Sequence, residues 1–164
     1  MKAQHLELLQ GMPIFGAIRA ESLAFLLEQA RERDVAAHGY FFREGEPALH
    51  LYVLERGEVT VRKQWQGHQF KLRRLGPGDC FGEMALMDLS DRSASVRAET
   101  DCRAIELSPA DLLRLFEHDA EQFALIQMNI GREVCRRLRV TDELLFQALM
   151  GQQTPALDSV FQSL

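Results

Sequence analysis

The sequence has little cysteine, and its three cysteines form no recognisable pattern. Cys80, Cys102 and Cys135 lie 22 and 33 positions apart, so the chain has no C-x-x-C pair. Zinc, iron–sulfur and dithiol redox sites generally need such closely spaced pairs. We therefore expect three buried thiols and no metal or redox centre built on cysteine.

Long apolar runs are also absent. In the C-terminal part, the longest stretch without a charged residue covers only residues 122–131, whereas a membrane helix needs about 18 apolar residues. His5 and Glu7 interrupt the apolar segment that an N-terminal signal peptide would require. We expect no membrane association and a cytoplasmic location.

Positive charge is not concentrated anywhere in the chain. The 19 lysines and arginines are outnumbered by 24 aspartates and glutamates, which gives a formal net charge of −5. Nucleic-acid binding draws its affinity from clustered cations. Direct binding to nucleic acid is therefore disfavoured.

Length and composition predict one folded domain. The chain has 164 residues, of which 46% are hydrophobic and 26% charged, as in ordinary globular proteins. One domain takes roughly 150 residues, and a chain of this size buries about 70% of its unfolded surface. We expect a single domain over residues 1–150 and a short tail over residues 151–164.

Turn glycines divide the middle of the chain into short β runs. Residues 1–31 are predicted to be helical, with a break at Gly11, Pro13 and Gly16. Residues 35–107 then predict strands at 40–43, 49–54, 59–65, 70–75, 95–98 and 102–107. This spacing is typical of an antiparallel barrel or sandwich.

Helical periodicity returns over residues 109–150. Ser108, Pro109 and Asp111 form a helix start, and a long helix is predicted over residues 121–150. Its apolar seam consists of Phe123, Ile126, Ile130, Val134, Leu138, Thr141, Leu145 and Leu149. Such a helix would be about 45 Å long, longer than a small barrel is wide. We therefore favour a homodimer contact along this helix over packing entirely against its own barrel.

Residues 76–96 bring together glycine, a carboxylate, an arginine and small hydroxyls between strands. Gly82 permits close backbone approach, and the turn after it would offer backbone N–H groups to an anion. The guanidinium of Arg92 can bind two phosphate oxygens, and Glu83 can accept hydrogen bonds from a sugar hydroxyl. This set suits an anionic ribose phosphate.

The same segment resembles the phosphate-binding cassette of the cyclic nucleotide-binding domain family, which reads approximately F-G-E-x-A-L, a short loop, and R-[ST/A]-A-x-V. The matching residues are Phe81, Gly82, Glu83, Met84, Ala85 and Leu86, then Arg92, Ser93, Ala94, Ser95 and Val96. Residues 13–15, 42–46 and 51–59 also resemble the family's usual strand and turn sequences, so most of residues 12–149 is covered. The chain is similar to catabolite activator protein-like sensory domains without the DNA-binding domain.

The resemblance implies a mainly β fold, an eight-stranded jelly-roll-like barrel (double-stranded β-helix) with flanking helices. It also implies a non-catalytic regulatory role, in which Arg92 binds the cyclic phosphate and Glu83 the ribose 2′-hydroxyl. The implied ligand-binding set is Phe81, Gly82, Glu83, Met84, Ala85, Leu86, Arg92, Ser93, Ala94 and Ser95. Candidates for base contact on the long helix are Gln127, Asn129, Arg132, Arg136 and Arg137.

The expected ligand is cAMP, with cGMP as the alternative and no other cofactor. Its binding would move the C-terminal helix and so signal to an unidentified downstream protein. Typical allosteric couplings are about 1 to 3 kcal/mol.

Other interpretations remain open. Glu83 and Arg92 could simply pair with each other across a turn. A ligand-free dimerisation or interaction module is the main alternative, because Asp88 and Asp91 place negative charge near the expected anion site. A cupin-type metalloenzyme is less favoured: His50 has Tyr52 where a second histidine ligand would stand. No G-x-S-x-G elbow is present either, so we expect neither a metal site nor an enzyme.

Overall fold

The computed structural model describes residue 6 and residues 9–150 of the chain. The described residues 6, 9 and 10 are helical, and the short helix η1 (Pro13–Phe15), the helix α2 (Ala20–Leu27) and strand β1 (Arg31–Val35) follow. The predicted helical region over residues 1–31 was therefore wrong at its C-terminal end; residues 1–5, 7 and 8 lie outside the described residues. β1 is a charged edge strand whose first four residues are exposed, so it lacks the apolar alternation that identifies a strand in sequence.

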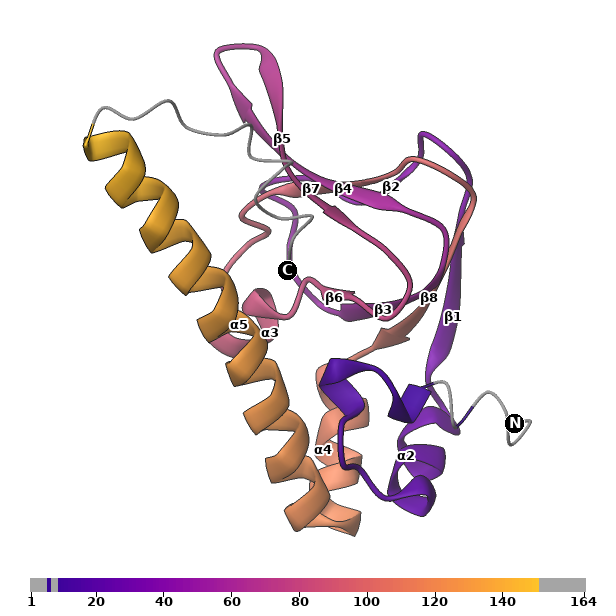
Figure 1. The fold of residues 1–164 in the computed structure, drawn as a ribbon. Helices are drawn as coiled ribbons and strands as arrows, with labels where there is room; N and C mark the ends of the chain where they lie inside the picture. Colours follow the sequence, from indigo (N-terminus) through magenta and orange to yellow (C-terminus); the bar gives the residue numbers. More distant parts are fainter. Residues whose placement is uncertain (1–5, 7–8, 151–164) are drawn as a thin grey trace.

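Eight strands form two antiparallel sheets that face each other (Figure 1). The first sheet has the order β1-β8-β3-β6 and the second β2-β7-β4-β5. The remaining strands are β2 (Tyr40–Phe42), β3 (Leu51–Arg56), β4 (Val59–Trp65), β5 (His68–Leu75), β6 (Cys80–Phe81), β7 (Ser95–Ala98) and β8 (Cys102–Leu107). The mainly β, jelly-roll-like architecture is confirmed, with the strands hydrogen-bonded as two open sheets. The two-residue strand β6 was not predicted because so short a run has no periodicity.

Two apolar clusters hold this architecture together. One lies between the two sheets and includes Phe41, Tyr52, Leu54 and Val96. The other packs the outer side of the first sheet against the helices. Its members include Phe15, Leu23, Leu51, Leu107, Leu115, Ile126 and Ile130. Burial of these side chains holds the helices against the first sheet, whose strand β6 leads into the candidate site.

A polar network joins β4 to the residue that follows β7, its inner neighbour in the second sheet. The hydroxyl of Thr60 donates to Oε1 of Glu99 at 2.6 Å, and Nη2 of Arg62 donates to the same oxygen at 2.8 Å. The Thr60 hydrogen bond, followed by the hydrogen bond and charge of Arg62, lowers the pKa of Glu99 to about 2. Glu99 therefore stabilises the fold through its ionised form.

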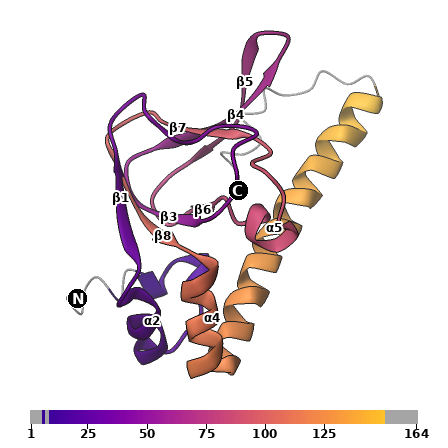
Figure 2. The ribbon, with the colours of Figure 1, turned by 180° about the vertical axis from the view of Figure 1, so that it is seen from behind.

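One helix lies within the cassette segment, between β6 and β7, and two more follow the last strand β8. α3 (Met84–Asp88) lies between the barrel and α5 (Ala120–Leu149), while α4 (Pro109–His118) packs beside α5 and α2 (Figure 2). As predicted, Ser108 caps α4: its hydroxyl accepts from the backbone N–H of Asp111, whose carboxylate accepts from the N–H of Ser108. This reciprocal capping box satisfies two backbone donors at the helix start.

The apolar seam of α5 is covered only along its first half. Ile126 and Ile130 are buried, whereas Leu138, Leu145 and Leu149 are 58%, 57% and 77% exposed. Figure 1 shows the second half of α5 running past the barrel. The homodimer stays a prediction, and so does the division of the chain at residue 150.

Two of the three cysteines are buried and one is exposed. Cys80 and Cys102 are buried. Cys135 is exposed on α5, so the expectation of a buried thiol was wrong there, because its helix face carries no covering element among the described residues.

Within residues 6 and 9–150, no helix is long and apolar enough to cross a membrane.

Candidate functional site

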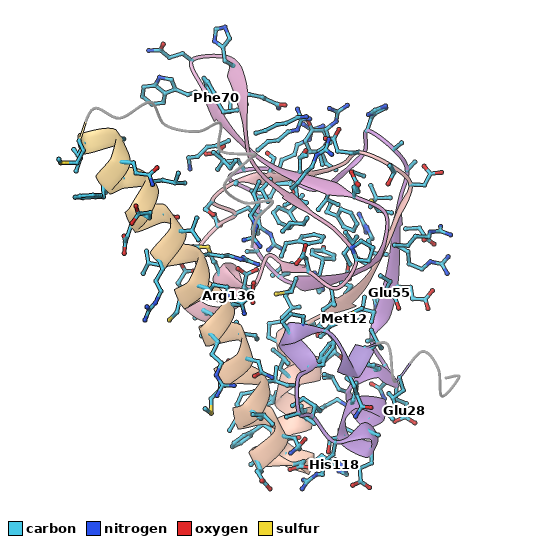
Figure 3. All side chains as sticks on the ribbon, in the orientation of Figure 1. Met12, Glu28, Glu55, Phe70, His118 and Arg136 are labelled. Carbon is cyan, nitrogen blue, oxygen red and sulfur yellow. The ribbon has the colours of Figure 1, made fainter. Side chains whose placement is uncertain are left out.

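A cavity of about 140 Å³ opens between the second sheet, the segment from β6 to β7, and α5. Strands β4 and β5 contribute Val61 and Leu75, and β2 contributes Phe42. Both Glu83 and Arg92 line it, together with Arg137 from α5. Figure 3 shows the neighbouring Arg136 on the stretch of α5 that runs beside α3.

Gly82 shapes the innermost part of this cavity. Its φ of +78° lies in the left-handed region, where a side chain is strained. A Cβ at this position would stand 2.6 Å from Nη1 of Arg92 and 3.2 Å from the carbonyl oxygen of His50. Only glycine therefore leaves room for the Arg92 guanidinium here.

The guanidinium of Arg92 is held by carbonyl groups and an aromatic ring. Nη1 donates to the carbonyl of Gly82 at 3.1 Å, Nη2 donates to that of His50 at 2.7 Å, and the group lies 3.9 Å from the Phe42 ring centroid. The backbone of Arg92 is fixed as well, because its N–H donates to Glu46 and its carbonyl accepts from Gly45. The guanidinium is thus positioned by the fold itself.

The charge of Arg92 has no carboxylate partner among the described residues. The side chain is only 5% exposed, and Nε has no hydrogen-bond acceptor within the described part of the chain. Burial lowers the pKa of this guanidinium below its usual value. A buried cation without a counter-ion is costly, and a bound anion would offset that cost.

Glu83 pairs with Arg137 and not with Arg92. The carboxylate is 1% exposed, and its Oε1 accepts a short hydrogen bond from Nη1 of Arg137. Nη2 of Arg137 donates to the carbonyl of Cys80 at 2.7 Å. Oε2 of Glu83 has no hydrogen-bond partner within residues 6 and 9–150. The alternative interpretation, in which Glu83 and Arg92 pair with each other across a turn, was wrong, because Arg137 of α5 supplies the counter-ion of Glu83.

Comparison with known proteins assigns this arrangement to a family. The family model "Cyclic nucleotide-binding domain" matches residues 32–119. The chain belongs to the cyclic nucleotide-binding domain family.

Two relatives illustrate this assignment. The chain is 30% identical over 151 residues to the "CRP-like cAMP-activated global transcriptional regulator" of Mycobacterium tuberculosis, covering 89% of this chain and 66% of the relative. It is 31% identical over 135 residues to the "Cyclic AMP receptor protein" of Thermus thermophilus, covering 82% of this chain and 61% of the relative. The chain therefore spans about two thirds of the length of these relatives.

Solved structures agree with this assignment. The crystal structure of the Thermus thermophilus catabolite activator protein gives a TM-score of 0.73 at 30% identity, covering 85% of this chain and 63% of that one. The regulatory domain of Toxoplasma gondii PKA, in a co-crystal structure with cAMP, gives a TM-score of 0.63 at 25% identity, covering 70% of this chain and 46% of that one.

The other cassette residues of this cyclic nucleotide-binding domain differ in position. Ser93 and Ala94 line the cavity, as does Met84, which is 49% exposed. Phe81 also contributes to the lining and stacks on Tyr52 in the core between the sheets. The hydroxyl of Ser95 accepts from the N–H of Glu44 and is outside the lining. Ala85 and Leu86 lie within α3, and their side chains are outside the described set.

Of the five α5 residues considered for base contact, Arg137 lines the cassette cavity. Asn129 is buried and donates to the carbonyls of Ile14 and Gly16, which is a structural role. The remaining three lie elsewhere: Arg132 donates to Asn129, Arg136 pairs with Glu133, and Gln127 lines a separate apolar cavity beside α4. These positions were indistinguishable in sequence because helix rotation was unknown.

The structure also places residues that the sequence reasoning missed. Arg73 of β5 lines the cavity, and the carbonyl of His50 holds Arg92. Arg73 stands two positions before Leu75, so strand alternation alone would have placed both on one face. The contact of His50 runs through its backbone, which no side-chain pattern reveals.

The acidic residues near the cassette do not compete for Arg92. Asp88 and Asp91 lie at the rim of the cavity and are exposed, and Oδ1 of Asp88 accepts from the N–H of Ser90. Water screens such charges strongly. Within the described residues, no group of three histidine, cysteine, aspartate or glutamate side chains is placed to hold a metal ion.

Proposed function

We propose that this cyclic nucleotide-binding domain is a non-catalytic sensor that binds cAMP or cGMP in the cassette cavity. The observation that carries the proposal is the buried Arg92 guanidinium, which faces the cavity without a carboxylate partner in the described part of the chain. The cyclic phosphate supplies the missing negative charge, and its oxygens accept from the guanidinium. Gly82 keeps the backbone clear of this position.

Glu83 provides the second half of the proposed ligand contact. Its buried Oε2 lacks a donor among the described residues, and the ribose 2′-hydroxyl is a donor that fits an acceptor-only carboxylate. An unsatisfied buried polar atom costs about 1 to 3 kcal/mol. A ribose hydroxyl would remove that cost, and this supports Glu83 as the sugar-binding residue.

Arg137 would couple the cavity to α5. It joins Glu83 and the Cys80 carbonyl to the helix, and it lines the same cavity that the nucleotide would fill. Binding at Glu83 therefore changes the contact that holds α5 against the cassette. We expect α5 to take one position in the free protein and another in the nucleotide-bound protein. Nucleotide affinity would differ between these two positions by about 1 to 3 kcal/mol.

Cys135 gives a direct way to observe this coupling. It is exposed on α5, whereas Cys80 and Cys102 are buried, so a thiol-reactive fluorophore would label α5 selectively. We expect a nucleotide-dependent fluorescence change that Arg137→Met abolishes while calorimetric binding persists. An unchanged response in Arg137→Met would overturn the coupling through this arginine.

The exposed half of α5 supports a homodimer as the assembled form. Leu138, Leu145 and Leu149 extend the buried seam into solvent, and a second copy of α5 would cover them as in a helix pair. The signal would pass through this dimer to a downstream protein. A cytoplasmic location stays a prediction.

The second candidate function is a ligand-free interaction module. It is favoured by the same exposed seam, and it requires the Arg92 cavity to remain empty. Nucleotide binding separates the two candidates.

Calorimetric titration with cAMP and cGMP tests the proposed function. We expect micromolar or tighter binding by the wild-type protein and its loss in Arg92→Ala. Arg103→Ala is the control, because Arg103 lies on β8 and pairs with the exposed Asp34. No heat with either nucleotide from folded protein would overturn the sensor and leave the interaction module.

A further inference from the structure

The second half of α5 presents an apolar face that the described residues leave open. Leu138, Leu145 and Leu149 are more than half exposed, and their spacing of seven and four residues places them on one side of the helix. They continue the seam that is buried at Ile126 and Ile130. Figure 1 shows this half of α5 extending away from α2 and α4. Such a face is typical of a helix that packs against an apolar partner.

The chain carries a matching apolar pattern directly after α5, in residues 151–164, which lie outside the described residues. The large apolar residues of this segment recur at positions i, i+3, i+4 and i+7, the spacing that places side chains on one face of a helix. They are Leu157, Val160, Phe161 and Leu164. The residues between them are all polar: Asp158, Ser159, Gln162 and Ser163. The sequence therefore predicts a short amphipathic helix.

A helix-start signal precedes this pattern. Thr154 stands directly before Pro155, so a capping hydroxyl is followed by a proline at the first helical position. The same order occurs at Ser108 and Pro109, where the side chain of Ser108 caps α4. We therefore expect a helix over residues 155–164 that begins as α4 does.

The connection and the lengths suit a helical hairpin. α5 ends at Leu149, and Gly151 follows its C-cap Met150, at a position where glycine commonly terminates a helix. Residues 150–154 would join the two helices, and antiparallel helix pairs commonly use loops of about two to five residues. A helix over residues 155–164 is about 15 Å long, and the seam over residues 138–149 is about 18 Å long. The shorter helix would therefore cover most of the exposed seam.

We propose that residues 155–164 form a helix that folds back onto the exposed seam of α5, with its apolar face against Leu138, Leu145 and Leu149. Burial of the facing apolar side chains stabilises the contact. The short connection makes the contact intramolecular, which favours this segment over a separate molecule. The inference goes beyond the proposed function: a second copy of α5 can pair along the seam only after the segment leaves it, so the segment opposes the homodimer.

Hydrogen exchange of the full chain, followed by mass spectrometry at two protein concentrations, tests this contact. A helix as short as residues 155–164 is marginal in water on its own, so protection of its amides requires packing. We expect these amides to exchange at least about 10-fold more slowly than those of an unstructured peptide. The protection should be the same at both concentrations, because the contact lies within one chain.

Two adjacent substitutions provide the variant and its control. Val160→Glu places a charge in the apolar face and should abolish the protection of residues 155–164. Ser159→Glu places the same charge on the polar face and should leave the protection unchanged. Leu145→Glu, on the α5 side of the contact, should also abolish it. Unchanged exchange over the strands shows that each variant is folded.

Sedimentation equilibrium gives a second readout. Each copy must release its segment before the two seams pair, and mass action then links the two equilibria. Val160→Glu should therefore tighten the homodimer by at least about 10-fold, whereas Ser159→Glu should not.

Unprotected exchange over residues 155–164 in the wild-type protein would overturn the inference. Protection that rises with protein concentration would also overturn it and make a second copy the occupant of the seam. Protection that persists in Val160→Glu would contradict packing through the apolar face. A homodimer that Val160→Glu weakens would show that the segment supports the dimer, against the proposed competition.

Discussion

Removing the guanidinium of Arg137 should destabilise the ligand-free protein strongly. Arg137→Met leaves the carboxylate of Glu83, which is 1% exposed, without its counter-ion. Breaking a buried ion pair from one side costs about 3 to 5 kcal/mol. Arg137 is itself 22% exposed, and Oε2 of Glu83 already lacks a partner in the described residues. We therefore expect the lower end of that range, about 3 kcal/mol.

Arg136→Met is the matched control for this prediction. Arg136 is the adjacent residue on α5, is 50% exposed, and pairs with Glu133 three residues before it. Helix pairs three residues apart contribute about 0.2 to 0.5 kcal/mol, and we expect the upper end of that range here because the Glu133 side chain is 12% exposed. Urea unfolding at fixed protein concentration should give a clearly lower midpoint for Arg137→Met than for Arg136→Met, with similar slopes.

A double variant distinguishes the loss of this ion pair from a general folding defect. Glu83→Gln combined with Arg137→Met replaces the stranded carboxylate by a neutral amide, which costs less to bury. The double variant should be more stable than Arg137→Met alone. If the two single arginine variants agree within about 0.5 kcal/mol, or if the double variant is the least stable, the buried-pair account is refuted.

Three further perturbations test separate parts of the structure. Gly82→Ala should weaken nucleotide binding by at least about 10-fold, since its Cβ would stand 2.6 Å from Nη1 of Arg92; calorimetry measures this, and unchanged affinity contradicts the geometry. Glu99→Gln should lower the free energy of unfolding at pH 7 by about 2 kcal/mol. The pKa of Glu99 is about 2 in the folded protein, so its contribution to the wild-type free energy of unfolding is lost as pH falls from about 4.5 to 2. The free energies of unfolding of the wild-type protein and of Glu99→Gln should therefore converge over this pH range. Leu145→Glu should convert a dimer to monomer in sedimentation equilibrium; a dimer that persists in this variant would exclude the exposed seam as the interface.

Much of the fold was predictable because its signals are local. The capped start of α4 at Ser108 and the glycine-separated strands follow from turn and cap chemistry. β1 was missed since its residues, beginning at Arg31, are charged on an edge strand with little apolar surface. Its pairing with β8 is a tertiary contact across the chain, and no local pattern encodes it.

The site was predictable in its motif but not in its connections. Gly82, Glu83 and Arg92 meet in one cavity as their spacing suggested. The ion pair to Arg137 spans 54 positions, and its existence depends on how α5 is rotated against the cassette. Predicting that Arg73 lines the cavity would also have required the register of β5 against β4. Such long-range geometry arises from packing, so single-sequence periodicity does not supply it.

The proposed function requires that a cyclic nucleotide complete the hydrogen bonding of Arg92. The most direct measurement is the arginine Nε–H region of a ¹H–¹⁵N spectrum, with the Arg92 signal assigned through Arg92→Lys, recorded with and without saturating cGMP or cAMP. The account predicts a large shift of the Arg92 Nε–H signal, because Nε has no acceptor within the described residues of the free protein. Nucleotide binding that leaves this signal unchanged would contradict the account and place the ligand elsewhere.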